Sequence, residues 1–289
     1  MTAAPENIQK SQLPWGEIAW FGLLTMACYA PVLRALVRQW ASDADMGHGF
    51  FVPVIAGYIV WQKRNELLAI KPQPNWWGLA VVILGGVQLI IGTLGVELFL
   101  ARTSFVIVLI GVVWLLGGDS MLKKLAFPLL LLFFMVPIDA VIYNQITFPL
   151  QLLASRLADG ALTLMSVPVL REGNILELPN QRLSVVEACS GIRSLLSLTF
   201  LSLVYGYFFE NKTWIRVVLF FSTVPIAIVA NSSRVTITGV LTEVKPEAAE
   251  GFFHEAEGWV IFMVALVILI LFHQLITRVS NYMVARRKP

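Results

Sequence analysis

The chain has little charge and only two cysteines. Only 13% of its 289 residues are charged and 57% are hydrophobic, whereas about a quarter of the residues are charged in a typical soluble protein. A chain with so little charge cannot cover a globule with polar groups, and no long polar segment is present to form a soluble domain. Its apolar surface therefore faces lipid. The composition predicts a single integral membrane domain over 1–289.

Several sequence signals of other protein classes are missing. There is no Walker loop, no GxGxxG and no cysteine–histidine cluster with metal spacing, so we expect no cofactor and no metal. Basic residues occur in small groups at the ends of apolar runs, which excludes a nucleic-acid patch. Cys28 and Cys189 do not look like a disulfide framework. The polar segment 1–14 lacks the features of a cleaved signal peptide, so the first apolar run is expected to remain as an anchor.

Long apolar runs dominate what is present. A spanning helix needs roughly 20 mostly apolar residues, and the runs predict an all-α, polytopic fold with about eight transmembrane helices. A further stretch, 148–169, is interrupted by Arg156 and Asp159 and is expected to form an interfacial or partly inserted helix. The eight runs are 15–36, 48–61 (which is short), 76–94, 98–116, 125–143, 192–209, 214–240 and 258–276.

The basic residues near the ends of these runs predict the orientation. Cytoplasmic loops of membrane proteins carry an excess of Lys and Arg. With eight spans, seven of the eight lysines fall on one side, and Lys245 is the exception. We therefore expect a multi-pass protein of a bacterial inner membrane with a polar cytoplasmic N-terminus (1–14), a transmembrane core (15–276) and a basic cytoplasmic tail (277–289).

The segment 169–188 differs from the rest of the chain. Its apolar and polar residues partly alternate, and turn signals occur at Glu172–Gly173–Asn174 and at Pro179–Asn180. This pattern predicts a small β-hairpin or extended cover outside the membrane. The segment leads directly to Cys189. It could bind an extended substrate by strand addition, or it could be a plain connector.

Three polar sites fall on the same external face in this topology. Cys189 lies at the outer end of the sixth run, the sequence 231–234 (Asn-Ser-Ser-Arg) near the outer end of the seventh, and His254 just before the eighth. Each has an ordinary explanation, since cysteine is often a small buried hydrophobe and an arginine can extend its charge to the lipid headgroups. Their coincidence at one depth favours a functional site.

The three residue types suit acyl transfer. A cysteine attacks as the thiolate, and its free pKa of about 8.5 leaves little thiolate at neutral pH. A nearby His254 or Arg234 favours the charged form, and His254 can then protonate a leaving amine. The guanidinium of Arg234 can stabilise the oxyanion of a tetrahedral intermediate. The residues therefore indicate a cysteine nucleophile, Cys189, with Arg234 and His254 as its catalytic partners.

Four further residues are supporting candidates. Arg193 follows Cys189 by four residues, on the same face of a helix, and could replace Arg234 in its role. Ser190 lies where a helix begins, and helix N-termini offer unpaired N–H groups. Asn231 belongs to the polar group of the seventh run, and His48 is a second histidine on the outer side.

At these positions the sequence resembles the exosortases and archaeosortases. The similar segments are 187–195 (EACSGIRSL), 231–239 (NSSRVTITG), 253–259 (FHEAEGW) and an upstream region, 47–61 (GHGFFVPVIAGYIVW). The resemblance implies an eight-span membrane enzyme with Cys189, Arg234 and His254 as its catalytic residues. It also implies the substrate: membrane-anchored proteins with a C-terminal Pro-Glu-Pro sorting tail, a transmembrane segment and a basic end.

The sequence therefore predicts a cysteine protease or transpeptidase that acts at the outer, periplasmic face of the membrane. Two other functions remain open at this point. One is a non-enzymatic membrane subunit of an exopolysaccharide export machine, and the other is a small-solute transporter. A transporter should show paired broken helices in two related halves, and the sequence has none. Only the enzyme requires an irreplaceable thiol.

Overall fold

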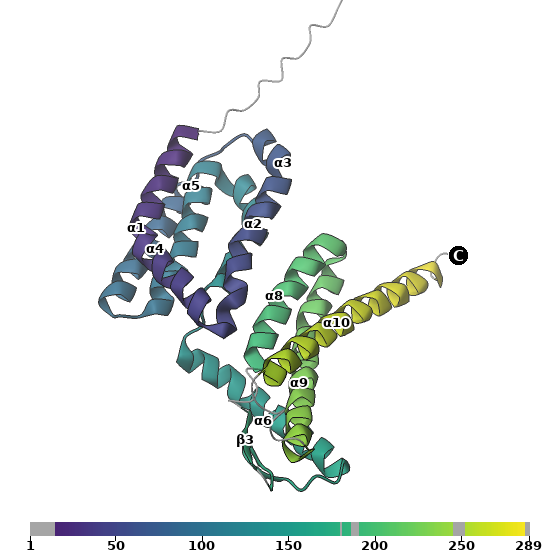
Figure 1. Cartoon of the computed structure of the whole chain (residues 1–289). Helices are drawn as coiled ribbons and strands as arrows, with labels where there is room; N and C mark the ends of the chain where they lie inside the picture. Colours follow the sequence, from purple (N-terminus) through teal and green to yellow (C-terminus); the bar gives the residue numbers. More distant parts are fainter. Residues whose placement is uncertain (1–14, 180, 186–190, 245–251, 287–289) are drawn as a thin grey trace, which may run out of the picture. The chain divides into compact units, whose positions relative to one another are not determined.

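The computed structural model describes residues 15–179, 181–185, 191–244 and 252–286 (Figure 1). The chain forms two compact units, Met1–Asp139 and Ala140–Pro289, and each is considered by itself. The expectation of one membrane domain over the whole chain stays a prediction.

The first unit is a helical bundle. Its core hairpin is formed by the two helices that pack most extensively, α4 and α5. The elements, in chain order, are α1 (Trp15–Ser42), the 3-10 helix η1 (Ala44–Phe50), α2 (Phe51–Gln62), α3 (Arg64–Ala69), α4 (Trp77–Leu94), α5 (Leu98–Leu131) and the 3-10 helix η2 (Leu132–Met135).

Three glycines spaced seven residues apart explain the close packing of α4 on α5. Gly78, Gly85 and Gly92 are all buried on one face of α4. A Cβ atom at Gly92 would lie 2.6 Å from the backbone nitrogen of Ala101 in α5. Small residues at such positions let two backbones approach closely, which is the usual basis of helix packing within a membrane.

The fifth predicted span, 125–143, is not a continuous helix. Helix α5 continues from the fourth predicted span through a kink at Gly118, whose φ of +75° favours glycine. Helix α5 is followed directly by the 3-10 helix η2, which ends before Pro137. A new helix begins at Ala140. Proline lacks an N–H group and disfavours a helical residue before it, so an apolar run alone does not ensure a single helix.

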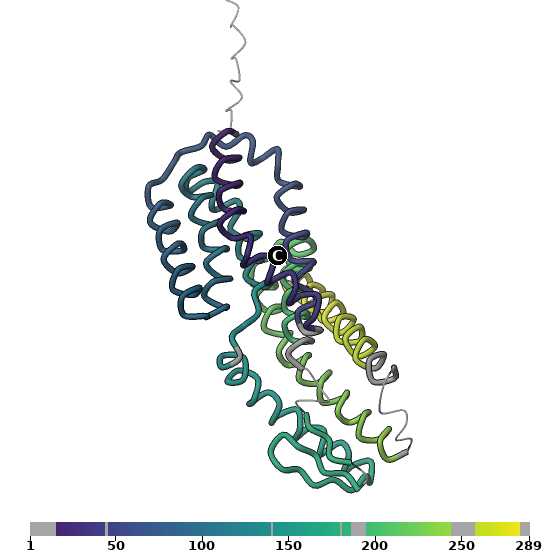
Figure 2. The backbone as a smooth tube through the Cα atoms, turned by 60° about the vertical axis from the view of Figure 1, so that its left-hand side comes forward, coloured from purple at the N-terminus to yellow at the C-terminus, as the bar shows by residue number. Residues whose placement is uncertain are grey.

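The second unit combines helices with a small sheet (Figure 2). Helix α6 covers most of the predicted interfacial stretch, and a three-stranded antiparallel sheet of order β1-β2-β3 follows it. The elements are α6 (Ala140–Leu164), β1 (Leu170–Glu172), β2 (Ile175–Glu177), β3 (Arg182–Ser184), α8 (Gly191–Phe209), α9 (Thr213–Val244) and α10 (Phe252–Arg286).

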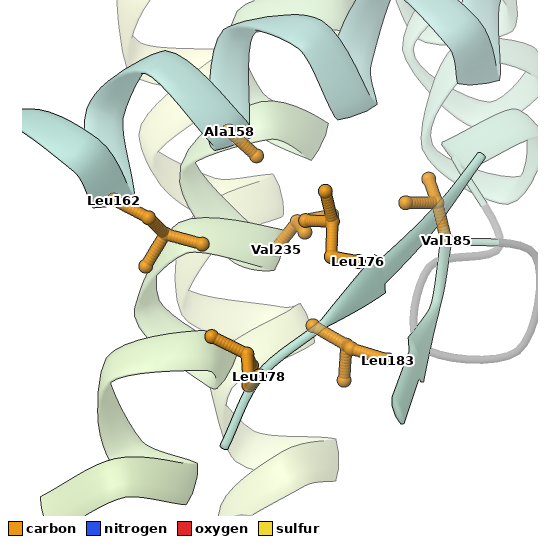
Figure 3. Packing of buried hydrophobic residues seen from close by; sticks show 7 residues of the cluster. All are labelled: Ala158, Leu162, Leu176, Leu178, Leu183, Val185 and Val235. Atoms are coloured by element: carbon orange, nitrogen blue, oxygen red, sulfur yellow. The ribbon is translucent and has the colours of Figure 1, made fainter. Parts of the chain in front are cut away.

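The sheet matches the extended segment expected from the sequence. The first turn signal is the actual turn between β1 and β2, where Gly173 has a φ of +65°. One face of the sheet packs on α6 and α9 through a cluster that Figure 3 shows from close by: Ala158, Leu162, Leu176, Leu178, Leu183, Val185 and Val235. The Ser155 hydroxyl of α6 also donates to the carbonyl oxygen of Gly173 over 3.0 Å. The position of this sheet outside the membrane stays a prediction.

Helices α8, α9 and α10 share a second apolar core. Its buried members are Leu198 from α8, three residues of α9 and two of α10: Ile215, Leu219, Ala227, Ala265 and Leu269. These helices coincide with three of the predicted spans. The three helices therefore form one packed layer.

Five helices in the described part of the chain are long and apolar enough to cross a membrane. In the most apolar window of each helix, between 17% and 44% of the residues are buried within the protein. This supports an all-α polytopic membrane protein, with lipid covering the exposed side chains. The larger number, eight spans, stays a prediction. The five segments are Gly16–Ser42, Trp77–Leu94, Leu98–Met135, Thr213–Glu243 and Gly258–Met283.

Candidate active site

Arg234 is the predicted catalytic residue that the structure describes most fully. It lies in the second half of α9, next to the fully buried Val235 of the sheet-facing core. Its own side chain is half-buried. The neighbouring hydroxyl of Ser233 donates to the carbonyl oxygen of Val229 over 2.9 Å. Because that serine bonds to its own helix, it is a structural residue, and the arginine carries the charge of this segment.

The guanidinium group of Arg234 lies against the bare backbone of Gly258 in α10. A Cβ atom at Gly258 would be 3.3 Å from Cζ and from one terminal nitrogen of Arg234, and 3.4 Å from the other. The planar group therefore rests on the helix at a point where any other residue would present a side chain. This contact connects α9 to α10.

Gly258 follows His254 by four residues, which is about one turn of helix, or about 6 Å along the axis. His254 belongs to the first turn of α10, which begins at Phe252. The side chain of His254 lies outside the described residues. The backbone nevertheless brings the charged end of Arg234 to within about one helical turn of the histidine position.

Two side-chain contacts set the register of α8 against its neighbours. The hydroxyls of Thr199 in α8 and Thr223 in α9 lie 3.2 Å apart. Because the two helices are antiparallel, moving eight residues toward the start of α8 corresponds to moving eight residues onward in α9, to Asn231. The start of α8, at Gly191, is thus level with the polar group that contains Arg234.

A contact between α8 and α10 places the start of α8 at the same height along the helix axes. The hydroxyl of Tyr205 in α8 lies 2.9 Å from Nδ1 of His273 in α10. These helices are parallel, so fourteen residues back from this contact lead to Gly191 in α8 and to Trp259 in α10. The register therefore puts the beginning of α8 beside the turn of α10 that supports Arg234.

The other predicted site residues are described only partly. Cys189 and Ser190 lie outside the described residues, although they directly precede the first residue of α8. Arg193 belongs to the first turn of α8, and its side chain is outside the described part. Asn231 is half-buried in α9. The roles of all four stay predictions.

His48 belongs to the first unit. It lies in η1, and its Nε2 is 3.2 Å from the carbonyl oxygen of Phe134. This contact gives the ring a structural partner within its own unit. A supporting role at the site stays a prediction.

Sequence reasoning missed a buried polar cluster at the turn between α8 and α9. The carboxylate of Glu210 lies 3.0 Å from Nε2 of His273, whose Nδ1 contacts Tyr205. The other carboxylate oxygen accepts the backbone N–H groups of Asn211 and Lys212, each over 2.8 Å. The signal available in the sequence was an acidic residue between two apolar runs and a histidine inside a third.

Hydrogen bonds to the carboxylate of Glu210 lower its pKa and so favour its charged form. Burial by itself raises the pKa of this carboxyl group. Hydrogen bonds from the backbone of Lys212, from His273 and from the backbone of Asn211 outweigh burial and lower the pKa below its usual value. The cluster joins α8 to α10 about 22 Å along the helix from Gly258, so it serves as a clamp that holds the register described above.

No metal centre is evident in the described ranges: His, Cys, Asp and Glu side chains do not gather there in groups of three or more. The chemistry that the described residues can supply is that of a fixed guanidinium group close to the start of two helices. Such a group stabilises developing negative charge.

Replacing Gly258 by alanine tests the contact with Arg234. The added methyl group forces the guanidinium to move by a few tenths of an ångström, and we expect activity to fall by about tenfold, because small misplacements at a reacting centre are costly. Alanine favours the helix by up to about 1 kcal/mol, so lower stability would not explain the loss. The matched control is Gly160→Ala in α6, where a Cβ atom meets open space. Equal activity of both variants would contradict the importance of this contact.

Comparison with known proteins identifies the family. Residues 40–271 match the family model described as transmembrane exosortase (Exosortase_EpsH). No curated protein and no solved structure gives a match. The matched range covers more than half of the chain and includes Cys189, Arg234, His254 and Gly258. The chain therefore belongs to the transmembrane exosortase family.

Proposed function

We propose that this protein is a membrane-embedded cysteine protease or transpeptidase that cleaves proteins at a C-terminal Pro-Glu-Pro sorting tail. The observation that carries the proposal is the contact of the Arg234 guanidinium with Gly258, one turn after His254. The helix register supports the proposal, because it places the first residue of α8, Gly191, level with Arg234. Cys189 lies two residues before Gly191 in the sequence.

The reaction begins with the thiolate of Cys189, which attacks the carbonyl carbon of a peptide bond next to the substrate's own membrane helix. Arg234 favours the thiolate and stabilises the oxyanion of the tetrahedral intermediate. His254 takes the thiol proton and gives it to the nitrogen of the leaving amine as the C–N bond breaks. The product is a thioester on Cys189, and water or an acceptor amine then releases the acyl group.

The test is co-expression with a Pro-Glu-Pro-tailed protein, followed by mass spectrometry of its C-terminus. Hydrolysis leaves a free carboxylate at the new C-terminus, whereas transfer leaves an amide to the acceptor. We expect one of these products only when the intact enzyme is present. A substrate that keeps its full tail in the presence of the accumulated enzyme would overturn the proposal.

We also propose that the site opens to the periplasmic side of a bacterial inner membrane. The lysine distribution supports this orientation. In a Cys28→Ala background, a membrane-impermeant maleimide should label Cys189 in intact spheroplasts. This background is needed because Cys28 is exposed on α1. Labelling that occurs only after the cytoplasmic side is opened would show the reverse orientation.

A further inference from the structure

Strand β3 lies at one edge of the sheet, and it ends five residues before the proposed nucleophile, Cys189. The strand order is β1-β2-β3, and β2 is the only strand in the described ranges that pairs with β3. Cys189 follows Ser184 by five residues, so the connecting chain can span at most about 17 Å. A peptide bound along this edge would therefore lie within reach of the thiol.

The hydrogen-bond pattern shows which groups of β3 face the open edge. The backbone N–H of Leu178 donates to the carbonyl of Gln181, and that of Val185 donates to the carbonyl of Asn174, both over 2.9 Å. In an antiparallel pair, alternate residues turn their polar groups toward the partner strand. Residues 181, 183 and 185 therefore face β2. The backbone N–H groups of Arg182 and Ser184 are directed away from it.

The two faces of β3 differ as strongly as its two edges. Leu183 and its cross-strand partner Leu176 are buried in the core (Figure 3). Arg182 points to the opposite face, where 67% of its side chain is exposed. Its Nε lies 2.8 Å from the carboxylate of Glu177, directly across on β2. Glu177 thus holds the guanidinium in place, while the exposed part of the group remains available to a second acid.

We propose that the outer edge of β3 binds the extended segment of the substrate that precedes its membrane helix, and that Arg182 binds an acidic side chain of this segment. The inference rests on the proposed function for the identity of the substrate. A residue that pairs with Arg182 across the new strand interface has its side chain on the same face of the sheet as the guanidinium. The acid would therefore lie beside Arg182, opposite Glu177.

The spacing of the two prolines in a Pro-Glu-Pro tail fits this arrangement. Proline has no backbone N–H group and is accepted in a sheet only where that position faces away from the neighbouring strand. When the central glutamate turns its N–H and C=O toward β3, both flanking prolines turn theirs outward. The tail can then add to the sheet edge without losing a hydrogen bond, and the prolines prevent a further strand from pairing with it.

A charge exchange tests the inference. Arg182→Glu should lower processing of the Pro-Glu-Pro substrate by about tenfold or more, the scale of one strong charged contact. A substrate whose tail glutamate is replaced by lysine should recover most of this loss with the Arg182→Glu enzyme and should be poor with the native enzyme. The matched control is Arg171→Glu on β1, at the other edge of the same sheet.

A second variant tests the backbone contact. Ser184→Pro removes an N–H group that faces the open edge and leaves the ladder to β2 intact, so substrate should be lost while the sheet remains. Leu183→Pro removes an N–H group that faces β2, so this control should lose the folded sheet itself. Thermal stability measured in detergent separates the two effects.

Substrate binding is measured separately from cleavage, by co-purification of uncleaved substrate with Cys189→Ala enzyme that carries each change. Recovery of binding by the lysine tail supports the β3 site, even if no cleavage occurs with the native enzyme and the proposed function fails. Equal binding and processing of both tails by the native and Arg182→Glu enzymes would overturn the inference. That result would leave the proposed function intact if Cys189→Ala alone still stops cleavage.

Discussion

Replacement of Cys189 by alanine or by serine is expected to reduce processing to background while the protein still inserts and accumulates. Alanine removes the nucleophile entirely. Serine keeps a hydroxyl of similar size, but this group ionises far less readily than a thiol, and a site that lowers a thiol pKa with a cation does not deprotonate it. The loss should therefore be as complete for serine as for alanine. Processing is followed by the mass of the substrate C-terminus.

The second cysteine provides the control for this experiment. Cys28 lies exposed on α1, in the unit that does not contain Arg234. Cys28→Ala should therefore leave processing nearly unchanged. Normal processing by the Cys189→Ala protein would end the cysteine mechanism, whatever the result at Cys28.

Long apolar runs and turn chemistry were sufficient to predict most helices and the sheet. The run 76–94 became α4, and the turn at Gly173 was visible because a tight turn after Glu172 needs a residue that tolerates positive φ. The prediction for 125–143 was wrong as a single helix, because hydropathy reports composition and does not detect the break before Pro137. Whether eight segments cross the membrane stays a prediction.

The site was predictable in its residue types and not in its contacts. A cysteine before one apolar run, an arginine within a second and a histidine before a third are visible in the sequence. The contact between Arg234 and Gly258 depends on the rotation of two helices about their axes, which no local pattern specifies. The clamp at Glu210 has the same origin, since α8 and α10 must be packed together before its partners meet.

The clamp joins α8 and α10, which are two of the three helices that form the candidate site. The core around Leu198, Ala227 and Ala265 separates them. Because packed helices shift as units more readily than they deform, the bonds of Glu210 with His273 hold the far end of α10 while Gly258 supports Arg234 at the near end. The geometry of the site therefore depends on residues well beyond it.

Arg234→Lys is expected to lower activity by about tenfold or more, although the positive charge is kept. The planar guanidinium lies flat against the backbone of Gly258 and offers several N–H donors in a fixed fork. A lysine ammonium is a compact, strongly hydrated charge that cannot reproduce this contact or hold an oxyanion with two parallel donors. A tenfold loss corresponds to about 1.4 kcal/mol of transition-state binding.

The matched change is Arg193→Lys in the first turn of α8. We expect it to cost less, because we assign Arg193 to supporting the helix or the substrate rather than to the oxyanion. Single-turnover rates with a tailed substrate, taken on purified protein in detergent or nanodiscs, separate the chemical step from binding. An inactive Arg193→Lys enzyme beside an active Arg234→Lys enzyme would transfer the catalytic role to Arg193. The Gly258 contact would then be structural, and α8 would carry both the nucleophile and the cation that activates it.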